Sequence, residues 1–157
     1  MNTILEKATK ETAIKQDAPD LRAEIANAES ELKKIPGAML GDCFPLVHTF
    51  GDGLYVREIQ VPKDSLVVTK IHKLAHPYFV LKGEISVLTE KGEQRVSAPY
   101  YGITPAGTKR ICYCHTDTVW VTVHATHETD LEKIENDIIA KDYDDILPDY
   151  VKNAIEI

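Results

Sequence analysis

Four of the six histidines fall in or beside segments that read as β-strands. They are His48, His72, His76 and His124. In a regular strand His72 shares a face with Lys70, and a turn over residues 73–75 brings His76 back into the same pocket. Paired imidazoles bind Zn, Fe, Ni, Mn or Cu when further ligands complete the shell. Spacing alone leaves two interpretations open, a metal site or ordinary solvated and core histidines.

The segments around these histidines have the residue pattern of an all-β domain. From about Cys43 to Thr126, short runs rich in Val, Ile, Thr and Tyr alternate with turn signals such as Lys82-Gly83 and Lys91-Gly92. Strands with no helices between them cannot make parallel crossovers. The pattern therefore predicts an antiparallel sandwich or barrel.

The order of His72, His76 and the phrase VLKGEISV resembles the first motif of the cupin superfamily, the small RmlC-like β-barrels. That motif reads G-x5-H-x-H-x3,4-E-x6-G. When its last glycine is set on Gly83, its two histidines fall on Lys70 and His72 and its glutamate falls on His76. The resemblance implies a mainly β, single antiparallel cupin or jelly-roll barrel with helical N-terminal and C-terminal extensions.

The later phrase PAGTKRICY resembles the second cupin motif, G-x5-P-x-G-x2-H-x3-N. Its metal-binding histidine falls on Arg110, whose planar fork suits a carboxylate or phosphate. We expect Arg110 either to hold an anion or to pair with an acid such as Glu58 or Asp117. A rearranged metal shell is the alternative, with His124 as the third ligand and His48 or His115 as less favoured substitutes. The cofactor in that case is a divalent Zn, Fe, Mn or Ni ion.

A longer resemblance, over roughly residues 32–134, is to small cupin proteins of tailed-phage genomes. Members of the superfamily include sugar epimerases and isomerases, metal-dependent dioxygenases and decarboxylases, and binding or storage proteins. The resemblance therefore implies a fold and leaves the reaction and any catalytic residue open.

Strand alternation proposes further residues for the ligand pocket. In LYVREIQV, Arg57 and Glu58 face opposite sides, so only one of them points into the barrel. Tyr78 shares the face of His76 and serves as pocket wall or as an acid or base. In TDTVWVTVHAT, Trp120 and His124 share one face, which either lines the barrel or meets a helix or a neighbouring subunit.

Helices are predicted on either side of the barrel. Apolar residues recur at helical spacing from Pro19 to Ile35, and a capping box at Thr129–Glu132 begins a second helix that runs to about Ala140. The predicted organisation is a helical extension over residues 1–40, a barrel over 41–127 and an acidic helical extension over 128–157.

Composition and charge narrow the classes of partner. The chain has 157 residues, 43% of them hydrophobic and 27% charged, which is typical of one globular domain. Residues 128–157 carry ten acidic and three basic side chains within a net charge of -7, which disfavours nucleic acid. Apolar runs are too short for a membrane span or a secretory signal, so a cytoplasmic location is expected, the host cytoplasm if the gene is phage-borne.

Three functional hypotheses follow. The first is an enzyme, of the metal-dependent isomerase, epimerase or oxygenase type, that uses His72 and His76 with a third ligand. The second is a non-catalytic module that binds an anionic small molecule through Arg110. The third is a phage-type structural or assembly oligomer that uses the barrel as a scaffold. A homo-oligomer, dimer or larger, is expected because exposed sheet edges tend to pair.

Overall fold

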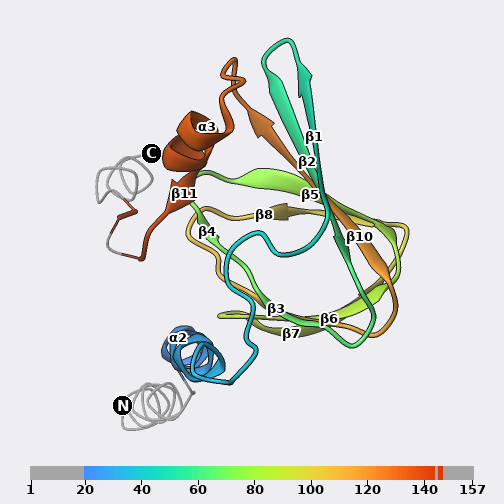
Figure 1. Ribbon diagram of the computed structural model, residues 1–157, viewed down its shortest axis with the longest axis vertical. Helices are drawn as coiled ribbons and strands as arrows, with labels where there is room; N and C mark the ends of the chain where they lie inside the picture. Colours follow the sequence, from blue (N-terminus) through green and yellow to red (C-terminus); the bar gives the residue numbers. More distant parts are fainter. Residues whose placement is uncertain (1–19, 144, 147–157) are drawn as a thin grey trace, which may run out of the picture.

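Two antiparallel sheets form the body of the protein in the computed structural model, which describes residues 20–143, 145 and 146 (Figure 1). The first sheet has the order β1-β2-β10-β5-β8, the second has the order β3-β9-β6-β7, and β11 pairs with β4. The strands are β1 (Leu46–Gly51), β2 (Leu54–Val61), β3 (Leu66–Val68), β4 (Ile71–His72), β5 (His76–Lys82), β6 (Glu84–Thr89), β7 (Gly92–Ser97), β8 (Tyr100–Thr104), β9 (Ile111–Cys114), β10 (Thr118–Ala125) and β11 (Ile139–Ala140).

The main core lies between the two sheets. Strands of the first sheet contribute Val61, Tyr78 and Val80, and strands of the second contribute Ile85, Val87, Val96, Cys112 and Cys114. Alternation explains this arrangement, because every second residue of a strand points to the same side. The fold of the described residues is mainly β, a single antiparallel barrel with one helix before it and one after it, as the sequence predicts.

Helix α2 (Leu21–Leu32) precedes the barrel. The carboxylate of Asp20 caps it by accepting the Ala23 N–H at 3.2 Å. The predicted helix is too long at its C-terminal end, because Ile35 lies past Leu32 and is 54% exposed. Pro19 and the rest of the predicted N-terminal helical region lie outside the described residues.

Helix α3 (Leu131–Ile138) follows the barrel, and its predicted cap is wrong by one residue. The carboxylate of Asp130, not the hydroxyl of Thr129, accepts the Lys133 N–H at 3.0 Å. The helix also ends before Ala140, because residues 139–140 leave the helix to pair with β4. The apolar face of α3 packs on Tyr55 of β2, which fixes the helix against the barrel.

No helix in the described part of the chain has the length and apolar character needed to span a bilayer. The three cysteines are free thiols, with Cys43 exposed and the other two buried.

Gly83 carries the chain from β5 in the first sheet to β6 in the second. Its φ is +95°, and a Cβ placed on it would lie 2.6 Å from the Asp117 carbonyl oxygen. Gly92, at the start of β7, also has a positive φ, +114°, but a Cβ there meets nothing within 4 Å. Both glycines therefore need a positive φ, but only Gly83 lacks room for a side chain.

This pair yields a test of the fold. We expect Gly92→Ala to lower the free energy of unfolding by about 1–2 kcal/mol through backbone strain alone. Gly83→Ala should cost a further ~1–3 kcal/mol, because the added methyl group overlaps the 117–118 backbone. Urea denaturation of both variants measures the difference, and equal losses would contradict the close packing at Gly83.

Candidate metal centre

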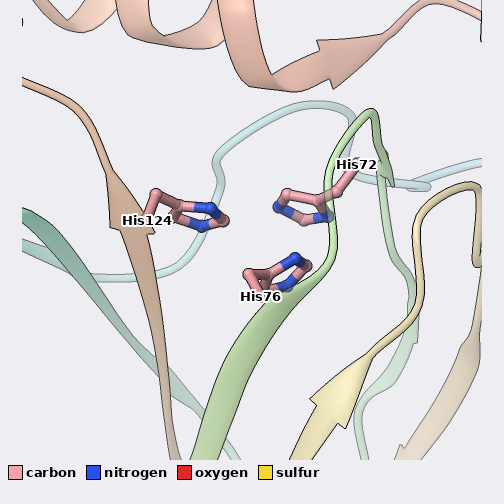
Figure 2. Close-up of side chains that lie close together, drawn as sticks. All are labelled: His72, His76 and His124. Carbon is pink, nitrogen blue, oxygen red and sulfur yellow. The ribbon is translucent and has the colours of Figure 1, made fainter. Parts of the chain in front are cut away.

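Three imidazoles from three strands converge at one end of the barrel. His72 ends β4, His76 begins β5 and His124 lies near the end of β10. One ring nitrogen from each lies within 4.8 Å of those of the other two. Figure 2 shows the three rings turned toward one another around a common point. The ring centroids are 4.2 Å apart for His72–His76, 4.6 Å for His76–His124 and 5.1 Å for His72–His124.

Sheet register brings His76 and His124 together. Thr122 of β10 pairs with Tyr78 of β5, so the antiparallel ladder, continued by two residues, sets His124 opposite His76. On the other side of β5, His76 pairs with Thr104 of β8. The two imidazoles thus sit on adjacent strands and on the inward face of both.

His72 is held by contacts from distant parts of the chain. It pairs with Ile139 of β11, and its carbonyl accepts the Gly107 N–H at 2.9 Å. The next residue, Lys73, donates its backbone N–H to the Ile138 carbonyl at 2.8 Å and its ammonium to the Asn136 carbonyl at 2.9 Å. The end of α3 therefore fastens the turn that presents His72 to the other two rings.

Hydrogen bonds orient the other imidazoles. Nδ1 of His76 lies 3.2 Å from the Leu74 carbonyl oxygen, which only accepts, so Nδ1 carries the proton and Nε2 keeps its lone pair. Nε2 of His124 lies 3.1 Å from the Thr122 hydroxyl. Tyr55 stacks on His124 at 6.0 Å, and its hydroxyl lies 2.8 Å from Nδ1 of His48.

Burial keeps the three imidazoles neutral. It lowers the pKa of His72 to about 2, with the neighbouring His76 and His124 adding to the shift. It lowers the pKa of His124 to about 4, again with a contribution from His76. The pKa of His76 is lowered as well, mainly by burial. At neutral pH all three rings therefore offer lone pairs without first losing a proton.

The donor set fits a divalent transition metal. Three neutral imidazole nitrogens suit Zn, Fe, Mn or Ni. Cys112 also lines the cavity, and burial raises the pKa of its thiol to about 12, but its sulfur is not part of the converging group of ligand atoms. The nearby carboxylates of Asp42 and Glu135 face Arg57 and Lys70 instead.

A cavity of about 860 Å³ opens beside the cluster, a size ordinary for a small-molecule site. Some of the predicted pocket residues line this cavity and others do not. Arg57 lines it and binds Asp42 at 2.8 Å, whereas Glu58 faces away and accepts a hydrogen bond from the Gln60 amide at 3.1 Å. Trp120 lines it too, so the 120-122-124 face of β10 is the inward one.

Tyr78 is buried and is not among the residues that line this cavity; it stacks on Trp120, with ring centroids 4.7 Å apart and planes inclined by 8°. Burial and its bond with Tyr100 raise the pKa of Tyr78 to about 12, so its phenol stays protonated. Gly102 lies opposite Tyr78 in β8, and a Cβ there would come within 3.0 Å of the tyrosine ring. The absence of a side chain at Gly102 leaves room for the Tyr78 ring against β8.

Arg110 is buried without the acidic partner that the sequence suggests. Its Nη2 donates to the Thr104 hydroxyl at 2.8 Å, and its guanidinium lies over the Tyr78 ring at 5.0 Å. Asp117 instead accepts the Lys63 N–H, and Glu58 faces outward. Within the described ranges no carboxylate stands at ion-pair distance from Arg110, so the expected pairing with Glu58 or Asp117 is wrong.

The two remaining candidate histidines lie outside the cluster. His48 bonds Tyr55, and His115 bonds the Ser86 hydroxyl at 2.9 Å on the second sheet. Asp42 and Thr104 are site residues that the sequence analysis missed. Asp42 lies in a loop with no periodicity, and a single threonine in a strand gives no signal of its own.

No protein-family model and no curated protein sequence match this chain. Among solved structures, it is similar to a cupin-2 domain containing protein from Shewanella frigidimarina (TM-score 0.45, 9% identity, 64% of this chain and 91% of that one). It is also similar to a protein named for ethanolamine utilization from Salmonella typhimurium (0.46, 17%, 55% and 72%). A third similar structure is an acetylacetone dioxygenase from Acinetobacter johnsonii (0.45, 17%, 58% and 65%). At such identities the chemistry must be argued from this chain's own residues.

The buried imidazoles predict an acid-sensitive protein. A histidine in the unfolded chain binds a proton near pH 6.5, whereas folded His124 and His72 resist protonation down to about 4 and 2. The stability of the metal-free protein should therefore be full above pH 6.5 and fall as the pH drops, by up to about 1.4 kcal/mol per pH unit for each such histidine.

Urea denaturation of chelator-treated protein at about pH 7 and about pH 5 measures this dependence. His72→Gln should flatten it by removing one buried titrating group. His127→Gln is the matched control, because the side chain of His127 is 85% exposed and outside the cluster. An equal slope in the wild type and His72→Gln would contradict the burial of a neutral His72.

Proposed function

We propose that this protein holds one divalent transition-metal ion through His72, His76 and His124 and binds a small ligand beside it. The observation that carries the proposal is the convergence of three ring nitrogens within 4.8 Å of one another. They come from three separate strands, and burial favours their neutral, metal-binding form. Chance clustering of surface histidines would leave such rings exposed and readily protonated.

A set of three protein ligands suits a site that keeps positions open for water or a ligand. A bound ion would supply Lewis acidity, polarising an oxygen atom of a ligand in the adjoining cavity. The chain's own residues orient the rings, through the Leu74 carbonyl and the Thr122 hydroxyl, and line the cavity with Trp120. These features serve an isomerase, epimerase or oxygenase and a binding protein equally well, so the reaction stays unassigned.

Other proposals about this protein come from the sequence. They are the division into residues 1–40, 41–127 and 128–157, assembly into a homo-oligomer, a cytoplasmic location, and kinship with small cupins of tailed phages.

Metal titration tests the proposed site. We expect chelator-treated protein to take up one equivalent of Zn²⁺ in titration calorimetry. His72→Ala, His76→Ala and His124→Ala should each weaken binding by about 10-fold or more, since losing a ligand should cost at least what losing an outer-shell partner costs. Elemental analysis of the purified protein identifies the metal it carries.

His115→Ala is the matched control, because His115 contacts Ser86 on the second sheet and not the cluster. It should leave the affinity unchanged. A wild-type protein that takes up no Zn²⁺, Fe²⁺, Mn²⁺ or Ni²⁺, or histidine variants that bind as tightly as the wild type, would overturn the proposal and favour a scaffold role for the barrel.

A further inference from the structure

The cations that line the cavity differ in their partners. Lys33 contacts Glu29 at 3.1 Å, Arg57 contacts Asp42 at 2.8 Å, and Lys70 contacts Glu135 at 2.5 Å. Arg110 lines the same cavity and has no carboxylate partner in the part of the chain that the structure describes. One positive charge in the cavity is thus left without a counter-charge.

Arg110 is also among the more deeply buried charged residues, with 7% of its surface exposed. A guanidinium has five N–H donors, and the hydroxyl of Thr104 accepts from only one nitrogen, Nη2. No fully buried side-chain nitrogen in the described residues lacks a partner, so any guanidinium nitrogen of Arg110 without a partner keeps some exposed surface, and Arg110 lines the cavity. A buried charge of this kind is costly unless an anion satisfies it.

The surroundings of Arg110 have a definite shape. Its guanidinium carbon lies 5.0 Å from the centre of the Tyr78 ring and 5.8 Å from that of Trp120. Those two rings are stacked face to face, and of the two Trp120 is the one that lines the cavity. Thr104, which binds Arg110, pairs in register with His76. The guanidinium therefore stands beside the imidazole cluster and against an aromatic surface.

We infer that the cavity binds a small, flat monocarboxylate, with Arg110 as the anchor for its carboxylate group. The fork of the guanidinium matches the two oxygens of a carboxylate, and the body of the ligand lies along Trp120. A single unpaired cation balances a single negative charge, which favours a carboxylate over a doubly charged phosphate. That the far end of the ligand reaches the metal rests on the proposed function, whereas the anchor does not.

Trp120 makes the inference testable, because it is the single tryptophan of the chain and lies in the wall of the site. Benzoate is the probe, benzamide is its neutral counterpart, and inorganic phosphate is the competing anion. Each is titrated into metal-free and Zn²⁺-loaded protein and followed by Trp120 fluorescence and calorimetry. We expect benzoate to bind in both forms and benzamide to bind at least about 10-fold more weakly, in line with a charge-assisted bond of about 1.5–3 kcal/mol.

Two variants separate the anchor from general charge effects. Arg110→Met should abolish benzoate binding, and Arg110→Lys should weaken it by about 10-fold, because a point charge does not reproduce the fork. Arg95→Met is the matched control: Arg95 is an exposed arginine that pairs with Glu84, and its loss changes the net charge equally. Circular dichroism checks folding, and if Arg110→Met fails to fold, a rise in wild-type melting temperature with benzoate but not benzamide provides the measurement.

Several results would overturn the inference: equal binding of benzoate and benzamide, unchanged binding in Arg110→Met, equal loss in Arg95→Met, or tighter binding of phosphate than of benzoate. Metal content is measured in parallel and should be the same in Arg110→Met as in the wild type. A protein that binds benzoate through Arg110 but takes up no metal supports the anchor and refutes the metal centre, so the two failures stay distinct.

Discussion

One end of the barrel interior is polar, and every polar group enclosed there must find a partner before the two sheets can close. Residues at the buried end of the first sheet are imidazoles and hydroxyls where an ordinary core would have aliphatic side chains. The described residues meet this constraint with bonds inside the barrel, among them those of Thr122 to His124 and of Thr104 to Arg110. The candidate site is thus part of the interior's own hydrogen bonding.

The register of the first sheet places these polar residues in rows that run across neighbouring strands. Tyr55, His124, His76 and Thr104 follow one another across β2, β10, β5 and β8. The next row inward along the strands holds Arg57, Thr122, Tyr78 and Gly102. A slip of one residue in β10 would send His124 and Trp120 to the outer face together, so the ligand cluster and the aromatic wall depend on the same pairing.

Features that rest on local periodicity were predictable from the sequence, and those that rest on distant pairing were not. Alternation places Arg57 and Glu58 on opposite faces, and the short turn after His72 returns His76 to the same side. No local sequence pattern predicts that Ile139, just after helix α3, pairs with His72, or that Asp42 forms an ion pair with Arg57. The cap of α3 was missed because Thr129 and Asp130 are both good capping residues, and packing of the helix on Tyr55 selects between them.

The pairing of β11 with β4 places residues 139–140 directly beside His72, one of the three clustered histidines. His72 lies opposite Ile139 in a strand formed by residues 139–140, well beyond the last barrel strand, and the neighbouring Lys73 donates its N–H to the Ile138 carbonyl. Anything that fixes His72 therefore also favours the docked form of that segment, and docking of the segment prepares His72 for its ligand. If an ion occupies the cluster, its binding and the pairing of residues 139–140 with β4 strengthen each other by the same free energy.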